Sequence, residues 1–135
     1  MLKFSHMIFY VKEVADTVSF YQKAFGLNIK FFHESGMYAE LDTGGTSLSF
    51  ASEQMAESNL PNGYQSHTLD NPPFANEIVF VSNDVVRDFK QAVGSGAVAL
   101  VEPEEKPWGQ LVGYVRDPNG ILIEIASEIK SKESE

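Results

Sequence analysis

The chain lacks cysteine, long apolar runs and an excess of basic residues, and each absence excludes a class of protein. Without cysteine it has neither a disulfide framework nor thiolate chemistry. No apolar stretch approaches the roughly 18 residues of a membrane helix, and the first residues lack the cleavage site of a signal peptide. The net charge of −9 argues against a nucleic-acid backbone as partner. We therefore expect a cytoplasmic protein that binds neither nucleic acid nor membrane.

The hydrophobic pattern repeats once along the 135 residues, of which 43% are hydrophobic. In each half, alternation predicts a strand, helical spacing predicts a helix, and three short strands follow. The expected strands are 2–11, 28–34, 36–41, 46–51, 76–81, 97–101, 110–116 and 121–126, and the expected helices are 14–26 and 84–94. This order predicts an α+β fold of two tandem βαβββ modules that form a curved mixed sheet around a cavity. We expect one domain, 1–127, with modules at about 1–53 and 76–127, a joining loop at 54–75 and a charged tail at 128–135.

The last strands of the two modules differ at one informative position. DTGGTSLSFASE, residues 42–53, aligns without a gap with DPNGILIEIASE, residues 117–128, and Ser49 then corresponds to Glu124. In the second copy the isoleucines point one way, towards the helix, and Glu124 points the other way, towards the expected cavity. An ionised carboxylate there is costly unless it is paired, hydrated or bound to a cation.

These features resemble the vicinal oxygen chelate superfamily, which includes glyoxalase I, extradiol dioxygenases and bleomycin-resistance proteins. The resemblance covers residues 1–127. It depends on the two βαβββ modules, the His in the first strand, and PWGQLVGYVRDPNGILIEIA, which is similar to the C-terminal signature of single-domain members. The resemblance implies a homodimer and a small-molecule site between two sheets, where some members hold a metal.

In the metal-using members the ligands come from the first and last strand of each module. The resemblance carries these positions to His6, Ser49, Asn76 and Glu124. Asn and Ser are poor ligands for transition metals, so two good candidates remain, and a tight site usually needs at least three protein ligands. His67, in the joining loop, is a further candidate ligand.

The residue that corresponds to His6 in the second module stays open in the sequence. Strand alternation sends Glu77 to the face opposite Asn76, unless a one-residue register shift makes Glu77 the aligned residue.

The wall of the expected cavity should include aromatic and polar side chains. These are Tyr38, Ser49, Asn76, Trp108 and Tyr114.

The small number of good ligands leaves three functions open. The first is a small-molecule-binding protein of the bleomycin-resistance type, with no metal and with a preference for cationic ligands. The second is an enzyme of the glyoxalase or dioxygenase type that uses Zn, Ni, Mn or Fe at His6 and Glu124, with Glu124 as the catalytic base. The third is a degenerate member without catalysis. The sequence favours the first.

Overall fold

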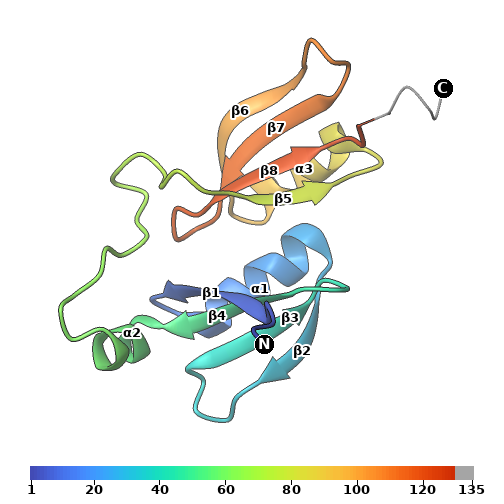
Figure 1. The fold of residues 1–135 in the computed structure, drawn as a ribbon. Coiled ribbons are helices and arrows are strands. Elements are labelled where there is room, and N and C mark those ends of the chain that lie inside the picture. Colours follow the sequence, from blue (N-terminus) through green and yellow to red (C-terminus); the bar gives the residue numbers. More distant parts are fainter. Residues whose placement is uncertain (130–135) are drawn as a thin grey trace. The chain divides into compact units, whose positions relative to one another are not determined.

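The computed structural model describes residues 1–129 and divides the chain into two compact units, Met1–His67 (unit 1) and Thr68 onward (unit 2). Both units are shown in Figure 1. Each unit contains one βαβββ module, which confirms the fold class predicted from the repeat. The predicted charged tail, 128–135, lies outside the described residues from position 130. No helix within residues 1–129 is long and apolar enough to cross a membrane.

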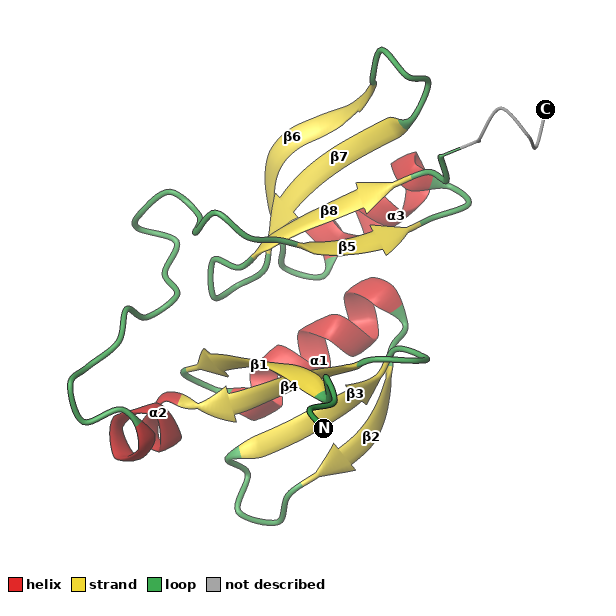
Figure 2. Ribbon diagram, in the orientation of Figure 1, coloured by secondary structure: helices red, strands yellow, loops and turns green. Residues whose placement is uncertain are grey.

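Unit 1 is a four-stranded sheet with a helix on one face (Figure 2). Its elements are β1 (His6–Val11), α1 (Val14–Phe25), β2 (Asn28–Phe32), β3 (Tyr38–Asp42), β4 (Ser47–Ser52) and α2 (Glu53–Asn59). The strand order is β1-β4-β3-β2, with β1 and β4 parallel. The core is aromatic, since the Tyr21 ring of α1 lies 4.9 Å from the Phe50 ring of β4 and neither side chain is exposed.

Unit 2 repeats this arrangement. Its elements are β5 (Ile78–Val81), α3 (Val85–Gly94), β6 (Val98–Glu105), β7 (Leu111–Arg116) and β8 (Leu122–Ala126), in the sheet order β5-β8-β7-β6. Phe89 of α3 packs so closely on Gly113 of β7 that a Cβ at Gly113 would lie 3.0 Å from the Phe89 ring. The residues on that face, including Val115, Ile123 and Ile125, are buried. The predicted packing of the isoleucines against the helix is therefore what the structure shows.

Two element boundaries differ from those expected. Helix α2 lies in the stretch interpreted as an irregular loop. It begins at Glu53 and is capped by Ser52, whose hydroxyl accepts a hydrogen bond from the Met55 backbone N–H. Strand β6 continues to Glu105, past Pro103, where the sequence indicated an end at Val101. It is an edge strand, where proline is tolerated because the missing N–H faces away from the sheet.

The start of unit 2 is fastened to the turn between β7 and β8. The buried Arg116 guanidinium donates hydrogen bonds to the carbonyl oxygens of Gly120 (3.0 Å), Asn71 (2.8 Å) and Thr68 (2.8 Å). Asp117, at the head of this turn, is fully buried and accepts from the backbone N–H groups of Asn119 and Ile121. The segment from Thr68 to Asn71 is thus part of the folded unit 2 rather than of a free connector.

Candidate functional site

The strand pairing shows which residues lie on the helix-distal face of each sheet, meaning the face opposite α1 in unit 1 and opposite α3 in unit 2. In unit 2, Glu124 pairs with Tyr114 on one side and with Val79 on the other. Directly paired residues point to the same face, and Gly113 and Ile123 face α3, so Glu124 and Tyr114 lie on the helix-distal face.

Glu77 joins these two residues. It precedes β5 by one position, and alternation from Val79 places it on the face of Glu124. Glu124 lies close enough to raise the pKa of the Glu77 carboxyl group, and the Tyr114 hydroxyl donates to Glu124 Oε1 at 3.1 Å. We call Glu77, Tyr114 and Glu124 the acidic cluster.

The electrostatics of the acidic cluster follow from its two like charges. Although Glu77 as a residue is exposed, loss of water around its carboxyl group raises the pKa, and the hydrogen bond and negative charge of Glu124 raise it further. Burial likewise raises the pKa of Tyr114, and the charge of Glu124 adds to the effect. The carboxyl group of Glu77 therefore takes up a proton more readily than a free Glu side chain does.

The register corrects the alignment at Asn76. In unit 1, Ile8 pairs with Ser49, and in unit 2, Val79 pairs with Glu124. Since Ser49 and Glu124 are equivalent, the residue two positions before Val79, which is Glu77, corresponds to His6. Asn76 is exposed and lies before the strand, and the one-residue shift left open by the sequence does occur.

The helix-distal face of unit 1 carries a different set of polar groups. His6 and Ser49 both lie on this face, and the Tyr38 hydroxyl donates to the buried Ser49 Oγ at 3.3 Å. Burial raises the pKa of Tyr38, and the nearby charge of Glu40 also raises it. Glu40 pairs directly with Ser49, and the sequence interpretation missed it, although its alternation with the buried Ala39 and Leu41 would have revealed it.

Two of the predicted site residues lie elsewhere. The His67 ring is 5.8 Å from the ring of Phe9, which is buried on the α1 side of β1, the face opposite to that of His6. Trp108 lies in the hairpin between β6 and β7, is 63% exposed, and donates its indole N–H to Gln110 Oε1 at 2.8 Å. The structure therefore does not place His67 beside His6, nor Trp108 in the acidic cluster.

Neither unit by itself holds a metal centre. Within each unit, no group of three or more His, Cys, Asp or Glu side chains among residues 1–129 could hold a metal ion. The acidic cluster of unit 2 has two carboxylates and a phenol, which are all oxygen ligands. Two carboxylates are fewer than the three protein ligands that a tight transition-metal site usually needs.

Comparison with known proteins supports the fold and the family. Three solved structures are similar to this chain. A glyoxalase-related enzyme from Fulvimarina pelagi is 20% identical, with a TM-score of 0.81 over 95% of this chain and 89% of that one. A glyoxalase/bleomycin resistance protein/dioxygenase family enzyme from Burkholderia phytofirmans PsJN is 20% identical, with a TM-score of 0.76 over 91% and 96%. TioX from Micromonospora sp. ML1 is 22% identical, with a TM-score of 0.66 over 92% and 98%.

At such identities the likeness shows the fold alone, and no curated protein matches the chain. The family model of the Glyoxalase/Bleomycin resistance protein/Dioxygenase superfamily matches residues 3–125, nearly the whole chain. The chain therefore belongs to the glyoxalase/bleomycin resistance protein/dioxygenase superfamily, as the resemblance had indicated.

Proposed function

We propose that the chain binds a small molecule on the helix-distal face of unit 2, with the acidic cluster as its polar anchor. The observation that carries this proposal is the hydrogen bond from the Tyr114 hydroxyl to Glu124, with the Glu77 carboxyl group on the same face of the sheet. Two carboxyl groups held together on a sheet face weaken the fold through like-charge repulsion unless a proton or another cation lies with them. A ligand with an ammonium or another cationic group takes the place of that proton.

The surroundings of the acidic cluster suit a ligand that is partly apolar. Val79, next to Glu124 in the sheet, is 49% exposed, and Val81 is 61% exposed. Exposed β-branched side chains beside half-buried polar groups such as Glu124 and Tyr114 are typical of binding surfaces, where apolar contact supplies affinity and a few polar groups fix orientation. The charge balance of the chain, −9, adds a long-range attraction for cations.

A thermal-shift panel of small amines, each with its alcohol isostere, tests this proposal. We expect at least one amine to stabilise the parent protein more than its alcohol does. Glu124→Gln should lower the affinity for that amine at least roughly tenfold, about 1.4 kcal/mol, while Glu105→Gln, on β6, should not. If no amine in the panel stabilises the parent, or if Glu124→Gln binds as the parent does, the proposal is wrong. The chain would then fit the degenerate class.

A second candidate function, a divalent-metal-dependent enzyme, is favoured by the corrected register. In metal-using members the ligands come from the first and last strand of each module. With the corrected register the first-strand position of unit 2 is Glu77 and not Asn76, so the candidate ligands are His6, Glu77 and Glu124. Because His6 belongs to unit 1 and the two glutamates belong to unit 2, neither unit alone holds three such groups, and we assign no catalytic step to a metal. Calorimetric titration of metal-stripped protein with Zn²⁺ or Mn²⁺ separates the candidates, since only the enzyme predicts one tight site that Glu77→Gln weakens.

We also infer that the chain forms a homodimer. Strand β1 lies at one edge of the unit 1 sheet and β5 at one edge of the unit 2 sheet. Both edges carry exposed apolar side chains, Met7 and Ile8 on β1 and Val79 and Val81 on β5. Such edges pair with other chains unless they are covered. Sedimentation should give twice the mass of 15.0 kDa, and a monomer at micromolar concentration would refute the inference.

A further inference from the structure

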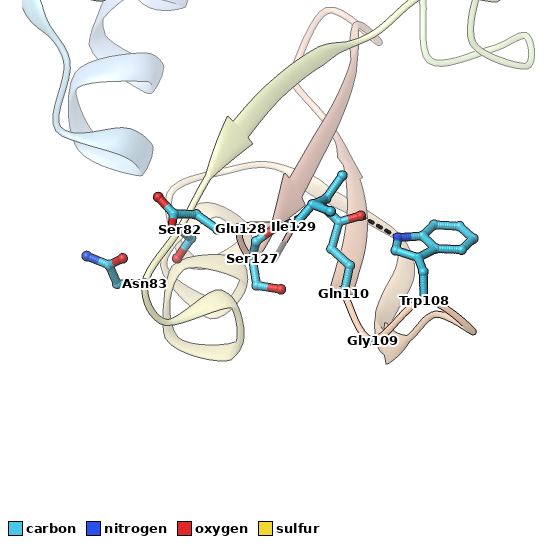
Figure 3. A pocket seen from close by; sticks show the side chains of 8 residues that line it. All are labelled: Ser82, Asn83, Trp108, Gly109, Gln110, Ser127, Glu128 and Ile129. Carbon is cyan, nitrogen blue, oxygen red and sulfur yellow. Dashed lines mark hydrogen bonds between the residues drawn. The ribbon is translucent and has the colours of Figure 1, made fainter. Parts of the chain in front are cut away.

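A pocket of about 450 Å³ lies at the end of the unit 2 sheet, where β5 and β8 end and β7 begins. Figure 3 shows the Trp108 ring and the Glu128 carboxylate at opposite ends of this pocket, pointing apart. A small ligand therefore does not contact both groups at once. In unit 1, by contrast, the pairing of β2 with β3 brings aromatic rings and a carboxylate together on one face of the sheet.

The aromatic side chains of this group lie at the β2 edge of the unit 1 sheet. Phe31 of β2 pairs directly with Glu40 of β3. Glu40 pairs with Ser49 on the helix-distal face, so the Phe31 side chain lies on that face as well. Tyr38 is two residues from Glu40 along β3 and shares its face. The centroids of the Phe31 and Tyr38 rings are 6.3 Å apart, with an interplanar angle of 51°.

His33 adds a third ring beside Phe31. Its backbone N–H donates to the Tyr38 carbonyl oxygen at 2.9 Å, and its ring centroid is 6.1 Å from that of Phe31, with an interplanar angle of 72°. The Ser35 backbone N–H donates to His33 Nδ1 at 3.0 Å, a bond that needs this nitrogen to be unprotonated and that holds the ring in place. We call His33, Phe31 and Tyr38 the ring row.

A β-bulge in β2 produces this arrangement. Ile29 pairs with Leu41, which is buried on the α1 side of the sheet. The register then shifts before Phe31, so Lys30 is the extra residue of the bulge. Without the shift, alternation from Ile29 would send Phe31 to the α1 side, away from Glu40. Bulges re-aim side chains in this way beside functional sites, and this one places an aromatic ring next to a carboxylate.

The ring row leaves part of its surface open to a ligand. Phe31 is 45% exposed, His33 is exposed and Tyr38 is half-buried. The Tyr38 hydroxyl donates to Ser49 Oγ at 3.3 Å, so the polar end of this ring is engaged within the protein. Rings that are already held by hydrogen bonds lose little side-chain entropy when a ligand covers them.

Glu40 supplies the negative charge of this surface. Burial raises the pKa of Tyr38 and the charge of Glu40 raises it further, as expected for a carboxylate close to the phenol. Within the described part of the chain, no cationic side chain forms a salt bridge with Glu40. Lys30 instead donates to Ser47 Oγ at 3.2 Å, and Ser47 lies four residues along β4 from Ala51, the partner of Tyr38.

We propose that the ring row binds a methylated ammonium cation, with its methyl groups on the ring faces and its charge beside Glu40. Ring faces attract cations within about 6 Å of their centroids. Neighbouring rings of the row are 6.1 and 6.3 Å apart, so one cation can lie within that distance of two rings. A primary ammonium group has three N–H donors that ring faces do not satisfy, whereas a trimethylammonium group has none.

The ring row belongs to unit 1 and shares no residue with the acidic cluster. A ligand on these rings therefore does not need Glu77 or Glu124, and the inference does not rest on the function proposed above.

A titration of the full-length protein, followed by its backbone amide NMR signals, tests the proposal. The probes are choline, its uncharged isostere 3,3-dimethylbutan-1-ol, and ethanolamine, whose ammonium group carries N–H donors. We expect choline to cause saturable shifts at residues 31–40 and each of the other probes to bind at least roughly tenfold more weakly. Equal affinity for choline and either of the other probes, or shifts that do not saturate, would overturn the proposal.

Matched ring variants locate the site. Phe31→Leu should weaken choline binding at least roughly tenfold, because it removes the central ring, whereas Phe31→Tyr keeps a ring and should bind as the parent does. Phe32→Leu is the control, because Phe32 is the next residue, is 38% exposed and pairs with Ala39 on the α1 side. Equal choline binding by Phe31→Leu and Phe32→Leu would show that the ring row is not the site.

Three charge variants complete the test. Glu40→Gln should remove the preference for choline over its isostere, and Glu57→Gln, at an exposed position of α2, should keep it. Glu124→Gln, which disables the acidic cluster, should bind choline as the parent does, so failure of the proposed function and failure of this inference give different results. If Glu40→Gln keeps the preference, or if Glu124→Gln abolishes choline binding, the inference is wrong.

Discussion

Glu77 and Glu124 lie on one face of unit 2, close enough for Glu124 to raise the pKa of the Glu77 carboxyl group. Two ionised carboxylates have acceptors and no donor, so their proximity is costly unless a proton or another cation lies with them. The question raised by the sequence, why a carboxylate survives inside the apolar strand β8, thus has a structural answer within unit 2. Glu124 accepts a hydrogen bond from the Tyr114 hydroxyl and shares its face of the sheet with Glu77.

The raised pKa of Glu77 predicts how stability depends on pH. A carboxyl group whose pKa is higher in the folded state binds more protons there than in the unfolded chain. Its favourable contribution is complete below the ordinary Glu pKa, about 4.3, and is lost as the pH rises through the folded-state pKa. Urea unfolding across this range should show a decline in the free energy of unfolding that is weaker in Glu77→Gln. Glu105→Gln is the matched control, and identical pH profiles for the parent and Glu77→Gln would contradict the assignment.

The Tyr114 hydroxyl donates a hydrogen bond to Glu124, so its removal should cost stability. We expect Tyr114→Phe to lower the free energy of unfolding by about 1.5–3 kcal/mol, the range for a hydrogen bond to a charged group. Tyr10→Phe is the control, because the Tyr10 hydroxyl accepts a longer hydrogen bond, 3.3 Å from Asn59, at an exposed position. Denaturant unfolding should show a smaller loss for Tyr10→Phe. Equal losses would mean that the phenol contributes nothing specific to the acidic cluster.

The sequence predicted the modules because the buried faces of the strands follow strict alternation. Ile121, Ile123 and Ile125 pack on the helix side as expected, and the gapless alignment of Ser49 with Glu124 agrees with the observed pairing of Ile8 and Val79. Alternation fixes which residues share a face of a strand, and this is sufficient to build each sheet.

The sequence failed where the answer depended on pairing or on capping. Apolar similarity aligns Asn76 with His6, but the register of a strand is set by its neighbour in the sheet. Because Val79 pairs with Glu124, Glu77 is the residue equivalent to His6. Helix α2 was missed because its seven residues are too few for a clear helical period, although the Ser52 cap was readable. The pocket at Trp108 combines a hairpin with two strand ends, and no local pattern brings these segments together.

The anchor at Arg116 predicts that a charge-conserving substitution will be costly. Arg116 donates to three carbonyl oxygens at once, and a lysine cannot reproduce this planar arrangement of donors. We expect Arg116→Lys to lower the free energy of unfolding by about 2–4 kcal/mol, since buried carbonyl groups lose their partners. Arg87→Lys is the control, because Arg87 is an exposed residue that pairs with Asp88 at 3.3 Å. A loss no greater than that of Arg87→Lys would show that Arg116 does not fasten the start of unit 2.

Gly120 should be the position in this turn least tolerant of a methyl group. Its φ of +101° is unfavourable for other residues, and an added Cβ would collide with the Thr68 carbonyl group, lying 2.6 Å from its carbon. Gly44 is the matched control, with a φ of +94° and no atom within 4 Å of an added Cβ. We expect Gly44→Ala to cost about 1 kcal/mol from the backbone alone and Gly120→Ala about 3 kcal/mol or more.

The same pair of variants tests whether Thr68–Asn71 is held by the turn. Because the collision displaces Thr68, Gly120→Ala should also release the segment from the Arg116 guanidinium and expose it to proteases. Limited proteolysis should therefore cut near residues 68–71 faster in Gly120→Ala than in Gly44→Ala when both are compared at equal global stability. Equal unfolding free energies and equal cleavage rates in the two variants would show that the contact between Gly120 and Thr68 has no part in holding the segment to unit 2.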